Sequence, residues 1–282
     1  MFNNTRLSNI RPHASPGPGR IKVGAVEKKN VECEDLMRRP SEGIGPKFQE
    51  MTKYHPARPV GGGLRVNPAP PLTVYPETLP RVDLPQPQRD DGPGIWATIQ
   101  RRRSRRDFTG EPITLIELSQ ILWAVTGVTG DFDGFMLRAA ASAGALYPND
   151  TYLVINAVEG LAPGLAFYEV PEHRLCILAE GDFSAEIARA ALGQEYCATA
   201  AVVLVWIAVV ARCAWKYSDR AYRYIYLDAG HLGAHAQLAA EALGLGSVNI
   251  GALYDDEVAS LFGADGHQQI AVYMTAIGRV PS

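Results

Sequence analysis

The stretch WKYSDRAYRYIYLDAGH spans residues 215–231 and joins two apolar segments that decide the fold. Before it, residues 201–210 form a continuous run of Val, Ile, Leu, Ala and Trp, which predicts a strand buried on both faces of a sheet. This run is shorter than the ~20 residues that a membrane-spanning helix needs. After the stretch, residues 222–243 are rich in Ala and Leu and predict a long helix that Gly244 ends.

The rest of the pattern mixes helices and strands. Thr114 and Glu117 have the spacing of a capping box, which marks the start of a helix. Other helices are predicted over residues 95–103, 184–192 and 255–262, and strands over residues 151–157, 167–170, 174–178 and 270–277. The strands do not alternate strictly with helices, so we expect an α+β fold.

Proline divides the chain, because most of its 20 prolines lie before Gly94. This part cannot hold long helices or central strands. Residues 1–46 have few apolar side chains and are expected to be a mobile tail. Residues 47–93 are interpreted as an extended arm packed on the body, and residues 94–282 as the globular domain.

Composition limits the class of protein. A formal net charge of −3 gives no general attraction to nucleic acid or to anionic lipid. The four cysteines contain no CxxC pair, so a zinc ribbon, a redox dithiol and a disulfide scaffold are all disfavoured. The first 20 residues lack the apolar segment of a secretion signal. We therefore expect a cytoplasmic protein without a membrane attachment.

Residues 101–106 read RRRSRR and concentrate five positive charges in one segment. Guanidinium groups pair bidentately with phosphate oxygens, and a serine hydroxyl adds another donor. The segment follows a predicted helix, so its side chains can gather around one phosphate group. A solvated basic face or a weak RNA patch is the competing interpretation.

Two further segments could carry chemistry. Small residues at 142–145 precede Tyr147 and Pro148, and they allow a flat ligand to approach the backbone closely, although a tightly packed turn is the alternative. Lys216 and Tyr217 follow the predicted buried strand, where loss of water could make the lysine a proton acceptor. A surface lysine at a helix start is the alternative.

Two other patterns are set aside. Gly244, Gly246 and Gly251 resemble a dinucleotide fingerprint, but they follow a long helix and have the wrong spacing. His231 and His235 lie four residues apart on a predicted helix, with Asp228 on the same face. No further ligand cluster accompanies them, so we expect no metal site.

Several segments together resemble the SagB-type dehydrogenases, a branch of the FMN-dependent nitroreductase-like superfamily. They occur in family order over roughly residues 48–280: FQEMTKY from Phe48, RRRSRRDF from Arg101, SAGALYP from Ser142, WKYSDRAYRYIYLDAGH from Trp215, LGLGSVNIGAL from Leu243 and AIGR ending at Arg279. Two positions depart from the family pattern, because Ala141 replaces a usual Pro and His235 a common Asn.

The resemblance implies a nitroreductase-like fold with a central, mostly antiparallel sheet flanked by helices, in an intertwined homodimer that holds FMN between its subunits. The residues it implies for the phosphate and ribityl chain are Arg102, Arg103, Ser104, Arg106 and Arg279. Those implied around the flavin ring are Ser142, Ala143 and Gly144, with Ile250, Gly251 and Ala252 near its N5 edge. Lys216 and Tyr217 match the proton-transfer pair of the azoline-oxidising members.

The resemblance therefore implies an FMN-dependent dehydrogenase that oxidises thiazoline or oxazoline rings in a peptide to azoles, and that could work beside a cyclodehydratase partner. Two alternatives stay open. One is an NAD(P)H-dependent reductase of nitro compounds, quinones or enones. The other is a flavin-binding scaffold without turnover in a biosynthetic complex.

Overall fold

The computed structural model describes residues 43–54, 56 and 70–281. Most of the expected tail lies outside these residues. Helix α1 (Ile44–Met51) spans the expected boundary between tail and arm, so a helix stands where an extended arm is predicted to begin. It belongs to a compact unit separate from the body, which begins at Thr52. Among the described residues, no helix has the length and apolar character needed to cross a membrane.

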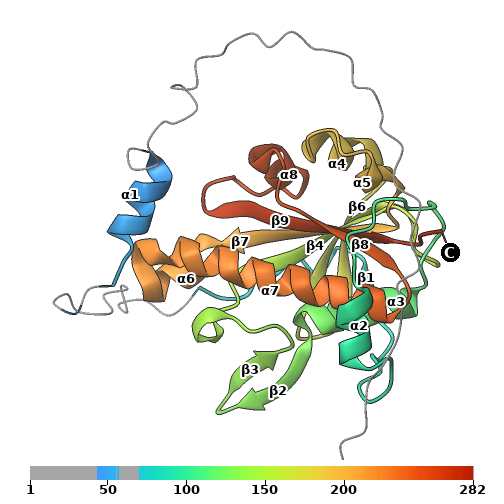
Figure 1. Ribbon diagram of the computed structural model, residues 1–282, viewed down its shortest axis with the longest axis horizontal. Coiled ribbons are helices and arrows are strands. Elements are labelled where there is room, and N and C mark those ends of the chain that lie inside the picture. The colour runs from blue at the N-terminus through green and yellow to red at the C-terminus, as the bar shows by residue number, and fades with distance from the viewer. Residues whose placement is uncertain (1–42, 55, 57–69, 282) are drawn as a thin grey trace, which may run out of the picture. The chain divides into compact units, whose positions relative to one another are not determined.

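A seven-stranded sheet forms the centre of the body, in the order β1-β6-β5-β4-β7-β9-β8 (Figure 1). Every neighbouring pair is antiparallel. The strands are β1 (Arg81–Asp83), β4 (Asn149–Ile155), β5 (Gly164–Glu169), β6 (Arg174–Glu180), β7 (Val202–Val209), β8 (Gly246–Ile250) and β9 (Gln269–Gly278).

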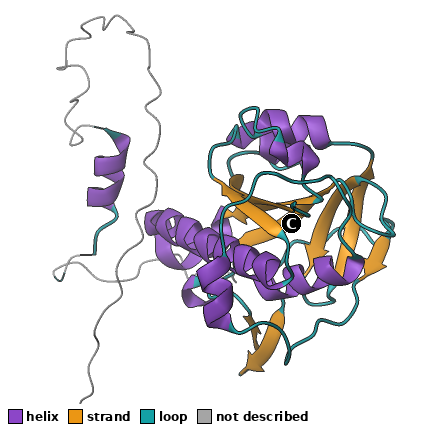
Figure 2. Ribbon diagram, turned by 45° about the vertical axis from the view of Figure 1, so that its right-hand side comes forward, coloured by secondary structure: helices purple, strands orange, loops and turns teal. Residues whose placement is uncertain are grey.

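Helices cover both faces of this sheet (Figures 1 and 2). One face carries α3 (Leu115–Thr126) and α7 (Ala221–Ala242), and the other carries α4 (Ser184–Ala190), α5 (Tyr196–Thr199) and α8 (Asp255–Leu261). The short helix α2 (Ile95–Arg101) contacts α7. This arrangement confirms the expected α+β fold with an antiparallel sheet flanked by helices.

Strand β7 explains why the sheet needs two layers of helices. Its side chains alternate between two cores: Val203, Val205 and Ile207 in one, and Val202, Leu204 and Trp206 in the other. Full burial of such a side chain contributes about 1.5–3 kcal/mol, so both faces must be covered. The prediction of a strand buried on both faces is confirmed.

Several short elements were not predicted from the sequence, among them those that follow. A helix, α6 (Val210–Tyr217), follows β7 directly. Strand β8 occupies the glycine-rich segment after α7 and pairs with β9. A two-stranded hairpin, β2 (Val128–Phe132) with β3 (Phe135–Arg138), extends from the body. Each is too short for periodicity alone to reveal it.

The described part of the predicted arm contacts the sheet. Strand β1 pairs with β6 at the sheet edge. Thr73 donates a hydrogen bond to the Asp150 carboxylate at 2.5 Å, and Arg81 pairs with Glu169 at 3.0 Å. Residues 70–83 therefore lie along β4, β5 and β6 and close one side of the sheet.

Candidate functional site

Lys216 and Tyr217 lie in the last turn of α6. The sequence interpretation placed them directly after the buried strand, and the structure corrects this, because the helix intervenes. Ser218 follows with φ 49° and ψ −137°, which non-glycine residues rarely adopt. Such strain often accompanies functional sites. The chain turns sharply here before α7 begins, so the two side chains sit at a corner between helices.

Both side chains converge on Gly144. A methyl group added to Gly144 would lie 2.7 Å from Lys216 Nζ and 2.7 Å from the Tyr217 hydroxyl. Burial raises the pKa of Tyr217, so its phenol stays protonated at neutral pH and can donate a hydrogen bond. The structure therefore unites two segments that lie far apart in the sequence.

The loop around Gly144 is strained as well as small. Gly144, Ala145 and Tyr147 all have positive φ, at 65°, 53° and 45°. Positive φ is costly for alanine and tyrosine, which carry a Cβ, so other contacts must hold the loop in place. This loop is the second strained segment beside Lys216.

Asp228 on α7 provides those contacts. Its carboxylate accepts a hydrogen bond from Ser142 Oγ at 2.6 Å and from the Ala143 N–H at 3.2 Å. Ser142 Oγ in turn accepts a bond from the Tyr147 N–H at 2.9 Å. Burial raises the pKa of Asp228, while these hydrogen bonds act to lower it. Sequence reasoning considered Asp228 only as a metal ligand and missed this role.

The two histidines on α7 also bind backbone. His231 Nδ1 lies 3.1 Å from the Ala141 carbonyl oxygen, and His235 Nδ1 lies 2.7 Å from that of Ala124. No group of three or more His, Cys, Asp and Glu in the described part of the chain is arranged to hold a metal ion. The histidines thus connect α7 to the loop before Ser142 and to α3.

Residues of the arm lie beside Tyr217. The Arg220 guanidinium lies 4.2 Å from the Tyr54 ring centre, donates through Nε to the Tyr224 hydroxyl at 2.9 Å and through Nη1 to the Thr52 carbonyl. The Tyr224 ring centre is 4.5 Å from that of Tyr217. Arg220 thus connects residues 52–54 of the arm to Tyr224, which packs on Tyr217, and sequence reasoning missed this contact.

The arginine segment follows α2 and runs beside β8. Ser104 forms a bridge with Ser247, and the Arg105 N–H donates to the Ser247 carbonyl at 2.9 Å. Arg103 Nη1 donates to carbonyls at the end of α2, and the Arg106 guanidinium lies 5.8 Å from the Tyr196 ring centre. Arg102 is half-buried, whereas Arg103, Ser104 and Arg106 are exposed. Arg105 differs, because it pairs with Asp107 at 2.9 Å.

Arg279 lies at the end of β9, next to this segment. Its Nη2 donates to Glu117 at 2.8 Å, and its backbone carbonyl accepts a bond from the Thr109 N–H. A Cβ on Gly246 would meet both Val280 and Arg105. The structure therefore brings the C-terminal strand to the arginine segment, although the Arg279 side chain is engaged with a carboxylate.

Residues Ile250, Gly251 and Ala252 leave the far end of β8. Ile250 is buried, while Gly251 and Ala252 are exposed, and Gly251 lies against the Tyr273 ring. Gln194 Nε2 donates to the Ala252 carbonyl at 3.0 Å. This backbone segment is thus held at the surface, at the opposite end of β8 from Ser104.

Comparison with known proteins identifies the family. The nitroreductase family model matches residues 99–279. A Methanocaldococcus jannaschii protein described as a nitroreductase is 39% identical over 158 residues, covering 56% of this chain and 78% of the relative. The chain belongs to the nitroreductase family. Membership of this family supports the interpretation that the chain is an oxidoreductase enzyme.

Two other proteins are similar to this chain. The trifolitoxin operon protein TfxC of Rhizobium leguminosarum is 28% identical over 149 residues, covering 48% of this chain and 41% of the relative. The chain thus spans less than half the length of that relative. A chain of the E. coli microcin synthetase McbBCD complex with truncated pro-MccB17 bound matches with a TM-score of 0.55 and 18% identity, over 84% of this chain and 87% of that chain. The latter likeness concerns the fold.

Proposed function

We propose that the protein is an FMN-dependent dehydrogenase that oxidises thiazoline or oxazoline rings of a peptide to azoles. The observation that carries this proposal is the convergence of Lys216 Nζ and the Tyr217 hydroxyl on Gly144. Gly144 belongs to the segment assigned to the flavin ring. A substrate stacked on that ring would therefore lie beside the proposed proton acceptor, Lys216, and the proton donor, Tyr217.

The donor set fits FMN. Exposed guanidinium groups at Arg103 and Arg106, with the Ser104 hydroxyl, suit a single phosphate group. Arg102 and Arg279 complete this set, while Ser142, Ala143 and Gly144 would line the ring and Ile250, Gly251 and Ala252 its reactive edge. When bound, FMN supplies the acceptor for a hydride, that is, for two electrons.

The chain's own part is to orient the substrate and to move a proton. Oxidation of an azoline to an azole removes one proton and one hydride equivalent. Lys216, acting as the neutral amine, takes the proton and becomes the ammonium, and Tyr217, whose phenol stays protonated, holds the ring by a hydrogen bond. The Ser142–Asp228 contact keeps Gly144 beside both side chains.

Two similarities support a peptide substrate. The Rhizobium relative is named for a trifolitoxin operon, and the microcin synthetase chain belongs to a complex with truncated pro-MccB17 bound. A cyclodehydratase that forms the azoline would then be the partner of this enzyme.

A homodimer would complete the site. Within one chain, the arginine segment with Arg279 and the Gly144 loop with Lys216 are two separate groups of residues, and the family resemblance assigns FMN to a site between subunits. Apolar side chains for such contact are exposed on α2 and α7, with Trp96 81% and Leu227 60% accessible.

The test substitutes Lys216→Ala and Tyr217→Phe. We expect oxidation of an azoline-containing peptide to slow by about 10²–10⁴-fold, the usual range for a lost acid–base group, with normal FMN content. Lys47→Ala, an exposed lysine on α1, is the matched control. Full turnover in both variants would remove the proposal's main support, and loss of FMN in both would make the pair structural.

The nitroreductase description of the Methanocaldococcus relative favours a second candidate, an NAD(P)H-dependent reductase. Stopped-flow mixing with NADH or NADPH distinguishes the two. Rapid flavin bleaching by either nucleotide supports the reductase, whereas bleaching only by the azoline peptide supports the dehydrogenase. A scaffold without turnover would show neither.

A further inference from the structure

The polar ends of the two side chains proposed to move the proton are not fixed by hydrogen bonds. Lys216 Nζ and the Tyr217 hydroxyl have no hydrogen-bond partner among the described residues. Lys216 Nζ lies 5.5 Å from the centre of the Tyr217 ring, so one substrate could meet both groups. Their positions must therefore come from α6, which carries them, and from the side chains packed around that helix.

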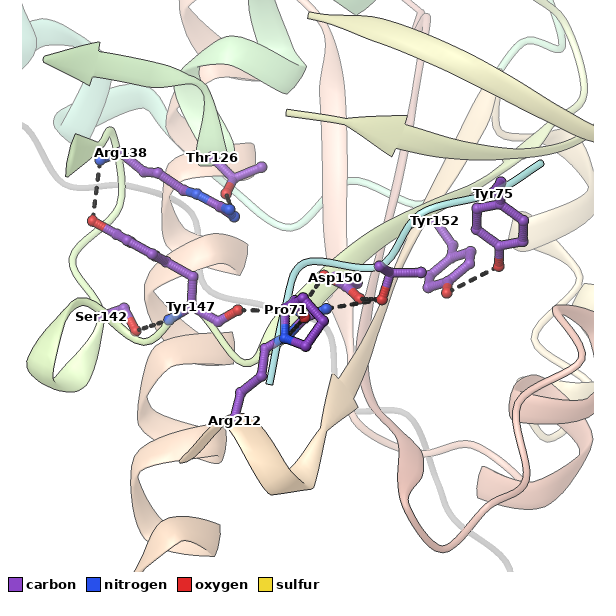
Figure 3. Close-up of polar contacts among 10 residues, drawn as sticks. Pro71, Tyr75, Thr126, Arg138, Ser142, Tyr147, Asp150, Tyr152 and Arg212 are labelled. Carbon is purple, nitrogen blue, oxygen red and sulfur yellow. Dashed lines mark hydrogen bonds and ion pairs between the residues drawn. The ribbon is translucent and has the colours of Figure 1, made fainter. Parts of the chain in front are cut away.

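The start of α6 is fixed by Arg212, which is 3% exposed. Its Nη1 pairs with the Asp150 carboxylate on β4 at 2.6 Å (Figure 3). Its Nε donates to the Pro71 carbonyl at 3.1 Å and its Nη2 to Thr73 Oγ1 at 2.8 Å, and both acceptors belong to the arm. One buried guanidinium thus connects the first turn of α6 to the sheet and to the arm.

The end of α6 is fixed less directly. The chain leaves the helix at Ser218 with strained dihedrals. The Tyr217 ring packs on the Tyr224 ring, with 4.5 Å between their centres. The Tyr224 hydroxyl accepts a hydrogen bond from Arg220 Nε at 2.9 Å and lies 3.4 Å from the Tyr54 hydroxyl. A ring contact, with an arginine behind it, thus determines where the Tyr217 hydroxyl lies.

Arg220 depends in turn on the arm. Thr52 is 6% exposed, and its carbonyl accepts a hydrogen bond from Arg220 Nη1, while its hydroxyl accepts one from Arg223 Nε at 2.6 Å. The Tyr54 ring covers the Arg220 guanidinium at 4.2 Å, in a cation–π contact. Apart from Tyr224, the described hydrogen-bond and ring partners of this guanidinium all belong to the arm. Thr52 and Tyr54 lie outside residues 99–279, which the family model matches.

We infer that Arg220 and Tyr224 are positioning residues that hold the Tyr217 hydroxyl at the substrate, and that Thr52 and Tyr54 of the arm keep this pair in place. This inference rests on the proposed function, in which Tyr217 contacts the substrate. Thr52 and Tyr54 have no described contact with the residues assigned to FMN, so their loss lowers turnover and leaves FMN content unchanged.

Steady-state oxidation of a thiazoline-containing peptide by the full chain is the first test. Arg220→Gln removes the charge and the Nε donor, and we expect kcat to fall at least tenfold, with KM and FMN content unchanged. The reason is that a displacement of ~1 Å in a positioned group can slow a reaction about 10²-fold. Tyr54→Ala, which uncovers Arg220, should lower kcat about threefold to tenfold. Arg189→Gln, at an exposed arginine paired with Glu257, is the control and should change nothing.

A double-mutant cycle shows whether Arg220 acts through Tyr217. Once Tyr217→Phe has removed the hydroxyl, its placement no longer matters, so adding Arg220→Gln should leave the remaining kcat unchanged. An arginine with a merely structural role would lower kcat by the same factor in both backgrounds. That result would overturn the inference, as would a wild-type kcat in both Arg220→Gln and Tyr54→Ala.

A second readout does not depend on the reaction. In the chain labelled with fluorotyrosine, the fluorine NMR line of Tyr217 is identified by its absence from Tyr217→Phe. Arg220→Gln and Tyr54→Ala should shift or broaden this line, and Arg189→Gln should not. If the wild type does not oxidise the peptide, the proposed function fails and this line alone decides the positioning role.

An unmoved Tyr217 line in both variants would overturn the inference whatever the activity. Circular dichroism shows whether each variant folds. Tyr54→Ala, at a side chain that is 47% exposed, decides the matter if Arg220→Gln does not fold.

Discussion

The Asp228 carboxylate is 5% exposed and orders the Gly144 loop through Ser142 and Ala143. Burial of a carboxylate is costly, but this one accepts hydrogen bonds from the Ser142 hydroxyl and the Ala143 N–H of that loop. Its position therefore has two consequences, one for stability and one for the pH dependence of stability.

We predict that Asp228→Ala lowers the free energy of unfolding by about 1–3 kcal/mol, because two donors lose their acceptor, and that Asp228→Asn lowers it less.

Burial raises the pKa of Asp228 above that of an exposed aspartate. The folded chain therefore holds this proton more tightly than the unfolded chain. The wild type should lose stability as pH rises from about 4 through the raised pKa, and Asp228→Asn should lack this loss. Denaturant unfolding over a pH series measures it, and parallel curves for the two proteins would contradict the assignment.

At this scale the sequence proposes candidate site residues by motif and order, but it does not reveal the contacts that hold them. Lys216 and Gly144 could be named because their segments match a family pattern. Asp228 could not be assigned its role, because its partner Ser142 is far away in the sequence and only the packing of α7 brings them together.

Among the elements, α3 joins local and distant contacts. Thr114 and Glu117 form the predicted capping box, which the structure confirms. Glu117 also accepts the Arg279 side chain from the end of β9. One carboxylate thus completes a helix cap and positions the arginine that is proposed to approach the phosphate.

We predict that Thr114→Ala lowers the free energy of unfolding by about 1 kcal/mol, the usual value of a lost N-cap. FMN affinity should fall only slightly, because Glu117 still pairs with Arg279. Thr78→Ala, at an exposed threonine outside any helix, serves as the control. Urea unfolding and flavin titration measure the two effects, and an unchanged stability would mean that the cap is not needed.

The arginine segment that follows α2 is proposed to bind the FMN phosphate, and this role can be tested by substitution. Arg103→Ala with Arg106→Ala should lower FMN affinity at least tenfold while the chain stays folded, because charged hydrogen bonds contribute roughly 1.5–3 kcal/mol each. Arg189→Ala provides a control for the loss of an exposed arginine. Flavin titration with circular dichroism measures both. Wild-type FMN affinity in this double variant would favour the competing interpretation, in which the segment is a solvated basic face.

The long elements were predictable and the short ones were not. Strand β7 and helix α7 have enough residues for apolar content to identify them. Helix α6 has only eight residues, and its first turn continues the apolar run of β7, so the boundary is hidden. Strand β8 is glycine-rich and becomes a strand through pairing with β9, which is a tertiary effect.

In the whole molecule, two cores lie on opposite faces of one sheet, and α2 exposes Ile95 at 52%, Trp96 at 81% and Ile99 at 49%. Contiguous exposed apolar side chains mark interaction sites. Because α2 leads directly into the arginine segment, a partner that covers this helix would also border the proposed phosphate site.

We predict that the protein is a homodimer and that separating the subunits releases FMN. Light scattering should give twice the 30.6 kDa mass of the chain. Trp96→Glu places a charge in the proposed interface, where desolvation is costly, so it should shift the mass toward the monomer and lower FMN content together. Ile44→Glu, at an 87% exposed side chain on α1, should change neither. The two readouts separate the possibilities: a Trp96→Glu monomer that keeps its FMN would locate the whole flavin site within one chain, and a Trp96→Glu dimer would exclude α2 from the interface.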